Sequence, residues 1–485
     1  MATLGIDEPL QLAGNKAAVF HNTITGRFKV LASLTEILAD FLTVLLSVLL
    51  ILQLYPFARR LTSYGSAAVV TLVALFAAVV VFMLDHQGAY QWGESLLSIR
   101  ETERVLRVSY QCWIALVVLS LFFEQYISHW LPLMVVLVMA PGLILEKHLL
   151  RSAIGVLHAH GFGAQRVLIY GAGYTGRSVA SALFRSASLG LTPVCMVDDS
   201  PSMAGKEILG TGYNHRHKLY VERGPLTHEQ ILESGAGIVI VAIPTLGRDK
   251  LASVAAVAAA TGAQLAFVPN NASPTDYWIE HSNIDGLMLS FIGGPAAPFG
   301  YDYVKRAVDF ALSLTALIAL SPLMLLIAAW VKLDSPGPAF FEQDRVGKDG
   351  TLFRMFKFRT MYRDAERHDY SPLNTLDIRI TKAGRWLRRS SLDELPQLIN
   401  VLKGEMALVG PRPEMPFIVD KHYGPRERRR LAVLPGITGL WQLSADRAFL
   451  IHENISYDLY YIRNRNLFMD FAVLAHTLVF AMRGI

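Results

Sequence analysis

Cysteine is nearly absent from this chain, which has only Cys112 and Cys195 among its 485 residues. Two cysteines with no metal-ligand spacing build neither a disulfide framework nor a zinc site, so we expect a reducing, cytoplasm-facing environment. Charged residues are also scarce, at 18% of the sequence. The first 28 residues lack the charged, apolar and small-residue order that is typical of a cleavable signal peptide.

Apolar residues are abundant instead. They make up 52% of the chain, and the mean hydropathy is +0.35, which is too high for an ordinary soluble enzyme. The length allows two to four domains. The formal net charge is +5, and Lys and Arg gather between residues 345 and 430. Basic surface beside a membrane suggests anionic lipid head groups or phosphorylated substrates, and we expect no nucleic acid partner.

Four apolar runs in the first 150 residues predict membrane helices. They cover about Leu34–Leu54, Ala67–Leu84, Tyr110–Phe123 and Trp130–Leu145. The first two are long enough to span a bilayer, and the other two need flanking residues to reach about 20. We therefore expect an N-terminal tail over residues 1–28 and four transmembrane helices over residues 29–150. A soluble helical bundle is the alternative, which runs of this length disfavour.

Positive charges in the loops predict how these helices are oriented. Lys and Arg precede the first run, and residues 124–129, between the third and fourth runs, contain neither. The loop before the third run and the end of the fourth run also carry positive charges, namely Arg100, Arg104, Arg107, Lys147 and Arg151. The positive-inside rule then puts the N-terminus, the loop between the second and third runs, and everything after Arg151 in the cytoplasm. Arg59 and Arg60, in the first outer loop, count against this orientation.

Residues 151–270 alternate β and helical patterns, which predicts a parallel sheet in a Rossmann-like α/β module. The β runs cover residues 166–170, 194–197, 237–242 and 265–268. Gly171, Gly173 and Gly176 follow the first run, and Asp198 comes about twenty residues later, as in a dinucleotide site. The glycines also fit a tight turn with close helix packing, and no Tyr-x-x-x-Lys follows. Binding of NAD(P) or another nucleotide is therefore left open.

A linker and a fifth apolar segment follow. Residues 271–300 are rich in Gly, Pro, Asn and Ser, which indicates a domain boundary. The segment over residues 305–332 carries positive charge at both ends, whereas a spanning helix is positive at one. Ser321 and Pro322 lie near its middle, where proline kinks or breaks a helix. We expect a re-entrant helix that dips into one leaflet and returns; a straight span is the alternative.

The last part of the chain holds two adjacent carboxylates, Asp393 and Glu394. Ser391 and Glu394 have the spacing of a capping box. Pro396 argues against it, because proline prefers the first helical position and moves the helix start near Leu395. The two acids then lie just before a helix N-terminus, where the helix dipole favours anions. Asp393 would be ionised and able to attack phosphorus, and Glu394 could hold Mg²⁺ together with substrate phosphates.

Basic residues around the acid pair suggest phosphate binding. Lys357 and Arg359 alternate with phenylalanines, which fits an ordinary amphipathic strand and a phosphate-binding strand equally well. Arg412 stands between Pro411 and Pro413, whose fixed backbone would present its guanidinium to a diphosphate. The arginines at positions 426 and 428–430 are instead expected on a solvated or lipid-facing surface.

The run from Lys305 to the C-terminus resembles the catalytic domain of the bacterial monotopic phosphoglycosyl transferases, also called bacterial sugar transferases. The whole chain resembles the large members that initiate exopolysaccharide, capsule or O-antigen synthesis. The matching motifs are Lys305-Arg306, Ser321-Pro322, Lys357–Met361, Ser391–Gln397, Pro411–Pro413 and Pro435–Gly439.

The resemblance implies an α/β catalytic domain over residues 301–485. It would transfer a sugar 1-phosphate from a UDP-sugar to undecaprenyl phosphate and release UMP. Asp393 would form a covalent phosphosugar intermediate, and Glu394 would bind Mg²⁺. The substrate-binding residues would be Arg412, Lys357, Arg359, Arg345, Pro411, Pro413 and Thr438.

The family also places an acid near the end of the domain, for which Asp458 and Asp470 are the candidates. Membrane lipids and a second copy of the chain, in a homodimer, are the expected partners. The alternative function is a membrane-bound nucleotide-sugar dehydratase or epimerase, which would need a bound dinucleotide and a catalytic Tyr/Lys pair. The first 300 residues could also act as a scaffold. Which hexose is transferred does not follow from the residues.

Overall fold

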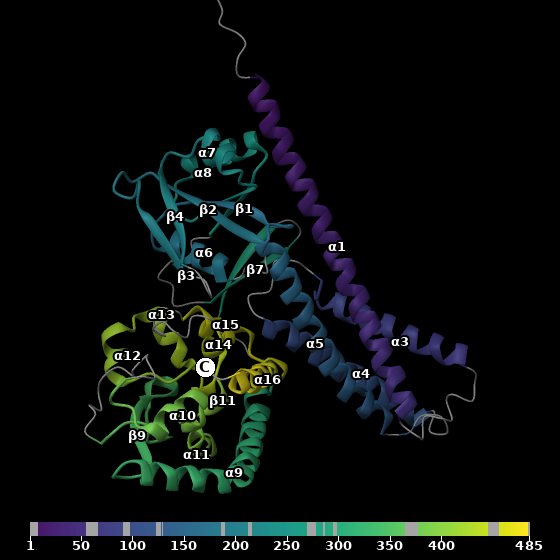
Figure 1. The fold of residues 1–485 in the computed structure, drawn as a ribbon, viewed down its shortest axis with the longest axis vertical. Helices are drawn as coiled ribbons and strands as arrows, with labels where there is room; N and C mark the ends of the chain where they lie inside the picture. Colours follow the sequence, from purple (N-terminus) through teal and green to yellow (C-terminus); the bar gives the residue numbers. More distant parts are fainter. Residues whose placement is uncertain are drawn as a thin grey trace, which may run out of the picture. The chain divides into compact units, whose positions relative to one another are not determined.

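The computed structural model describes residues 8–54, 66–90, 98–122, 128, 130–185, 190–211, 216–268, 278–284, 287–293, 298–363, 377–444 and 455–483. The chain divides into two compact units, Met1–Ser273 and Pro274–Ile485 (Figure 1). Each unit has its own buried core.

Four long apolar helices open the first unit, and each is long and apolar enough to cross a membrane. Buried side chains from all four form one core, in which Val44, Ala77, Val108 and Leu143 are fully buried. Many other large apolar side chains on these helices are exposed, as a surface that faces lipid would be. The helices are α1 (Glu8–Leu54), α3 (Ser66–His86), α4 (Ser98–Phe122) and α5 (Leu131–Ala159).

The bounds of these helices correct the predicted ones. α4 begins at Ser98, so the three arginines assigned to a loop lie on a helix, and α5 continues through Lys147 to Ala159. Much of the predicted tail is also helical, because α1 begins at Glu8. Ion pairs explain why the helices extend through charged residues. Lys147 Nζ lies 2.9 Å from Glu36 Oε1 and 2.9 Å from Asp40 Oδ2. The end of an apolar run is therefore not the end of its helix.

A six-stranded sheet follows in the first unit, with the strand order β3-β4-β2-β1-β5-β6. All neighbours pair in parallel except β3 and β4, which confirms the predicted parallel sheet. The strands are β1 (Gln165–Tyr170), β2 (Leu191–Asp198), β3 (Glu207–Thr211), β4 (Arg216–Arg223), β5 (Ile238–Val241) and β6 (Gln264–Phe267). The helices between them are α6 (Tyr174–Arg185), α7 (His228–Ser234) and α8 (Arg248–Thr261).

Helices cover both faces of this sheet. Side chains alternate along a strand, so Val167 and Ile169 pack with Ala180 of α6, whereas Leu168 and Tyr170 belong to a second cluster that includes α7 and α8. Strands β3 and β4 were not predicted. β4 lies next to the edge strand β3, and its short apolar centre, Leu219–Val221, stands between charged residues, so it lacks the longer apolar run by which the central strands were recognised.

The predicted linker over residues 271–300 contains an antiparallel hairpin, which corrects that prediction. Its strands are β7 (Trp278–Ile284) and β8 (Leu287–Gly293). Asp-Gly stands between them in the sequence, and that pair is typical of a two-residue hairpin turn. The glycine- and proline-rich composition of the whole segment obscured this local signal.

After the β7–β8 hairpin, the second unit continues with α9 (Tyr301–Asp334), one continuous helix with Pro322 inside it. In Figure 1 its ribbon changes direction along its length. Both ends contact the rest of the unit: Lys305 Nζ lies 3.1 Å from Asp470 Oδ2, and Ala383 N donates to Asp334 Oδ2 at 2.9 Å. The helix is thus bent without being broken, and its re-entry into one leaflet stays a prediction.

The remaining elements of the second unit are short. Strands β9 (Phe340–Val346) and β10 (Leu352–Phe358) pair antiparallel, and β11 (Ala407–Val409) pairs in parallel with β12 (Gly436–Thr438). The principal helices are α10 (Lys382–Ser390), α11 (Gln397–Lys403), α12 (Pro416–His422), α15 (Ser456–Asn464) and α16 (Leu467–Arg483). Ile327 and Val331 of α9 pack with Phe358 and Leu387, which joins α9 to β10 and α10.

Candidate active site

The acid pair lies on a short turn between α10 and α11. Helix α10 ends at Ser390, the next residue, Ser391, adopts a left-handed conformation with φ +56°, and residues Leu392–Glu394 form one 3-10 turn. Helix α11 begins at Gln397, directly after Pro396. The predicted helix start is therefore confirmed to within two residues. The capping box is wrong, because the Ser391 side chain makes no cap hydrogen bond and Glu394 is engaged elsewhere.

Two cations from distant parts of the chain hold Glu394. Lys357 of β10 donates to Glu394 Oε1 at 2.7 Å, and Arg412, from the turn after β11, donates to the same oxygen at 2.9 Å. The Glu394 and Lys357 side chains are 17% and 16% exposed, and that of Arg412 is 30% exposed. The site is thus reachable, and its two cations are fixed by one carboxylate.

The two neighbouring acids have opposite electrostatic properties. Burial raises the pKa of the Asp393 carboxyl to about 6, and the charge of Glu394 adds to the effect of burial while Lys357 opposes it. Burial would also raise the pKa of Glu394, but the charges and hydrogen bonds of Arg412 and Lys357 outweigh it and hold that pKa well below its usual range. Separated values of this kind are common where two acids have different roles.

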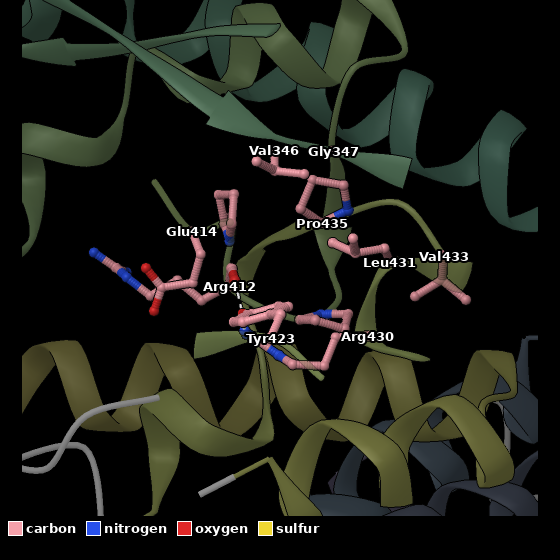
Figure 2. Close-up of a pocket in the computed structure, with 11 residues that line it drawn as sticks. Val346, Gly347, Arg412, Glu414, Tyr423, Arg430, Leu431, Val433 and Pro435 are labelled. Atoms are coloured by element: carbon pink, nitrogen blue, oxygen red, sulfur yellow. Dashed lines mark hydrogen bonds between the residues drawn. The ribbon is translucent and has the colours of Figure 1, made fainter. Parts of the chain in front are cut away.

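Arg412 lies on the turn Pro411–Pro413, and the backbone carbonyls of all three residues accept hydrogen bonds. Pro411 O accepts from Gly436 N at 2.9 Å, Arg412 O from Arg430 Nη2 at 2.9 Å, and Pro413 O from Arg345 Nη1 at 3.2 Å. Figure 2 shows the Arg412–Arg430 bond, with the Arg412 side chain extending away from Arg430. The cavity behind this turn has a volume of about 10 Å³, which is room for about one water molecule.

Arg430 corrects the expectation of a solvated basic surface. It is 3% exposed, its Nε donates to Asp458 Oδ2 at 2.7 Å, and it also donates to the Tyr423 hydroxyl. Burial by itself would lower the pKa of Arg430, but the charge of Asp458 raises it. Its position within a run of arginines concealed this role, because the acid partner comes 28 residues later in the sequence.

The other predicted site residues have different surroundings. Arg359 is buried and donates to Val331 O, Ser335 O and Pro336 O, so it fastens the C-terminal end of α9 and does not join the acid pair. Thr438 Oγ1 lies 2.8 Å from Thr477 Oγ1 of α16. Arg345, Pro411 and Pro413 belong to the Arg412 turn and its support.

The two candidate C-terminal acids are both engaged in buried contacts. Asp458 pairs with Arg430 at 2.7 Å. Asp470 accepts from Lys305 Nζ at 3.1 Å and from the hydroxyls of Tyr301 and Tyr461 at 2.7 and 2.6 Å. Both acids therefore connect elements of the second unit.

The glycine-rich loop of the first unit is shaped by its own packing. Gly171 has φ +108°, and a Cβ on Gly176 would clash with Gly171 O. Space around a Cβ on Gly173 is open. Asp198 accepts from Ala172 N at 2.7 Å and from Ser200 N at 2.8 Å, so both carboxylate oxygens bind nearby backbone. These contacts suit the tight-turn interpretation; nucleotide binding stays a prediction.

Few groups are available for a metal. Among the described residues no group of three or more His, Cys, Asp or Glu side chains could hold an ion. Mg²⁺ is often bound through one or two carboxylates plus substrate phosphates. Asp393 and Oε2 of Glu394, the oxygen that neither Lys357 nor Arg412 contacts, fit this arrangement.

Comparison with known proteins identifies relatives of the second unit. A family model for bacterial sugar transferases matches residues 300–484. The UDP-glucose:undecaprenyl-phosphate glucose-1-phosphate transferase of Caulobacter vibrioides is 40% identical over 195 residues, which cover 38% of this chain and 72% of the relative.

Two longer relatives match over the same region. One is the UDP-N-acetylgalactosamine-undecaprenyl-phosphate N-acetylgalactosaminephosphotransferase of Aeromonas hydrophila, 39% identical, with 41% of this chain and 49% of the relative covered. The other is the undecaprenyl-phosphate glucose phosphotransferase of Komagataeibacter xylinus, 41% identical, with 36% and 35% covered. The chain thus matches about half or less of the length of these two.

Proposed function

Because the chain belongs to the bacterial sugar transferase family, we propose that it transfers a sugar 1-phosphate from a UDP-sugar to undecaprenyl phosphate and releases UMP. This would be the first membrane step in the synthesis of an exopolysaccharide, capsule or O-antigen. The observation that carries the proposal is the acid pair. Asp393 and Glu394 are adjacent, yet their pKa values are shifted in opposite directions beside Lys357 and Arg412.

Asp393 is the proposed nucleophile. A carboxylate oxygen of Asp393 attacks the sugar-bearing phosphorus of the donor, a new O–P bond forms, and the bond from that phosphorus to the UMP oxygen breaks. UMP leaves with the electron pair. A phosphate oxygen of undecaprenyl phosphate then attacks the same phosphorus, the Asp393–phosphorus bond breaks, and the carboxylate is restored. Two sequential displacements let a soluble donor and a lipid acceptor use one site.

Lys357 and Arg412 are the proposed diphosphate contacts. Glu394 holds both in the free protein, so they are already placed beside Asp393 before the donor arrives. Fixed cations stabilise the negative charge that develops on a leaving phosphate, and they need no reorganisation at the moment of reaction. Mg²⁺, if held by Asp393 and Glu394 Oε2, would supply further neutralisation of the diphosphate charge.

We propose that α9 is a re-entrant helix and that the second unit lies on the cytoplasmic face of the bacterial inner membrane. Three observations support this topology: the positive charge at both ends of the helix, Pro322 within it, and contacts from both ends to one unit. Trp330 and Trp386 lie with ring centroids 5.5 Å apart and are partly exposed, as aromatic residues at a membrane interface are. We also propose that the protein forms a homodimer, as the resemblance implies.

The sugar is to be identified by assay. Relatives named for N-acetylgalactosamine and for glucose are almost equally similar to the chain, so similarity does not select one. Purified protein would be given a panel of UDP-hexoses and UDP-N-acetylhexosamines with undecaprenyl phosphate and Mg²⁺. The proposal requires UMP release with at least one donor, together with a lipid-linked sugar diphosphate. UDP as the product, or no product with any donor, would contradict it.

A further inference from the structure

We propose that Arg430 and Asp458 are positioning residues that hold Arg412 toward the donor diphosphate. This inference rests on the proposed function, because it takes the role of Arg412 from there. Both side chains are buried, and neither contacts Asp393 or Glu394 in the described structure. Their effect on the reaction with the donor is therefore indirect.

The first argument comes from the turn that carries Arg412. Pro411 and Pro413 have no N–H, so this turn offers carbonyls but few donors to its surroundings. Arg430 Nη2 supplies the hydrogen bond to Arg412 O, at 2.9 Å. That carbonyl belongs to the residue whose side chain binds Glu394 at 2.9 Å. A shift of this peptide would therefore move the Arg412 guanidinium with it.

The second argument is that Arg430 is buried where a nucleotide sugar does not reach it. It is 3% exposed, and its three nitrogens are used by Asp458, Tyr423 and Arg412. The cavity beside it, about 10 Å³ in volume, is too small for any part of a nucleotide sugar. Arg430 is thus able to act on the donor only through Arg412.

The third argument is that helix α15 holds the same strand and turn at two points. Asp458 and Tyr461 are three residues apart and lie on one face of this helix. Asp458 fixes Arg430, and the Tyr461 hydroxyl lies 3.1 Å from Val409 O, at the end of β11 just before the turn. Both side chains are buried, at 1% and 2% exposed. In some proteins buried polar groups fix one geometry rather than add stability, and that is the role assigned to this pair.

A double-mutant cycle on UMP release tests the inference in the full-length protein. Arg430→Gln is expected to lower kcat/KM for the donor by roughly 10- to 100-fold, the usual effect of misplacing a contact by about 1 Å. In an Arg412→Ala background the same change should cost less than about 3-fold, because no guanidinium is left to position. Asp458→Asn, which preserves volume, should follow the same pattern with a smaller loss and serves if Arg430→Gln does not fold.

Arg306→Gln is the matched control. Arg306 also donates to backbone carbonyls, at Val401 and Leu402, but it does not contact the Arg412 turn. Its loss should be the same in both backgrounds. Equal losses for Arg430→Gln with and without Arg412, or an undiminished kcat/KM in Arg430→Gln or Asp458→Asn, would overturn the inference. If Arg412→Ala retained full activity, both the inference and the proposed contact would fail. If the cycle were additive and the Asp393→Asn protein were inactive, the inference would fail and the proposed function would stand.

Discussion

Asp393 and Glu394 share their functional group and differ in what surrounds it. Asp393 is 8% exposed, and burial sets its pKa at about 6. Since only the ionised carboxylate attacks phosphorus, kcat/KM for UMP release should rise about tenfold per pH unit below about pH 6 and level off above it. Initial rates between pH 4.5 and 8 would show this. A flat profile across that range would contradict the assigned nucleophile.

Stability should depend on Asp393 in the opposite sense to activity. Its folded pKa of about 6 lies above the ordinary value of about 3.9, so the folded protein binds the proton more tightly and loses stability as pH rises from about 4 to 6. Asp393→Asn removes this penalty. The variant should be more stable than the unchanged protein at pH 8, by about 1–3 kcal/mol, and the difference should shrink toward pH 4. Thermal unfolding in detergent at both pH values measures it, and a less stable variant at pH 8 would refute it.

Glu394 should behave as the organiser of the two cations. Glu394→Gln leaves Lys357 and Arg412 without their shared carboxylate, and the folded protein should lose about 1–3 kcal/mol, less than for a fully buried pair because all three side chains are partly exposed. UMP release should fall roughly 100-fold. Glu405→Gln is a control, since Glu405 accepts from Asn400 and does not contact either cation. Equal effects of the two changes would contradict the assignment.

For single residues, the sequence predicts which side chains suit the proposed chemistry better than it predicts which groups each side chain contacts. Asp393, Glu394, Lys357 and Arg412 were identifiable because charged residues stood beside prolines or in a matching motif. In the structure Lys357 and Arg412 both contact Glu394. Arg359 and Arg430 lie in basic stretches like those around Lys357 and Arg412, the proposed diphosphate contacts. Only tertiary packing reveals that Arg359 fastens α9 and that Arg430 pairs with Asp458.

Among the secondary-structure elements, helix α9 has the membrane topology that can be tested most directly. A re-entrant helix leaves both flanks in the cytoplasm, so single cysteines at Phe299 and Lys348, both exposed, should be labelled only from the cytoplasmic side in a background without Cys112 and Cys195. Pro322→Ala restores a helix hydrogen bond and favours a straight helix, so it should reduce cytoplasmic labelling at position 348. Labelling of the two flanks from opposite sides in the unchanged helix would refute re-entry.

Elements were predictable where one periodicity dominates. The central strands of the parallel sheet and the long apolar helices follow directly from their apolar runs. Helix ends did not, because ion pairs such as Lys147 with Glu36 let α5 continue past its apolar stretch. The β7–β8 hairpin was missed because a composition typical of linkers surrounds it.

At the scale of the whole molecule, the proposed chemistry lies entirely in the second unit. The matched family region covers residues 300–484, and all proposed contacts lie in Pro274–Ile485. Residues 274–485 alone, in detergent, should release UMP at a rate within about tenfold of the full chain, because loss of the first unit removes no proposed contact. Complete loss of activity in a folded fragment would show that the first unit contributes to the site.

The most direct test of the account is UMP release by purified full-length protein and its Asp393→Asn variant, with the accepted UDP-sugar, undecaprenyl phosphate and Mg²⁺. Asparagine preserves the shape of the side chain and removes its nucleophilic oxygen, so the predicted result is UMP release by the unchanged protein and none above background by the variant. UMP release by a folded Asp393→Asn protein at a rate near that of the unchanged one would contradict the covalent mechanism.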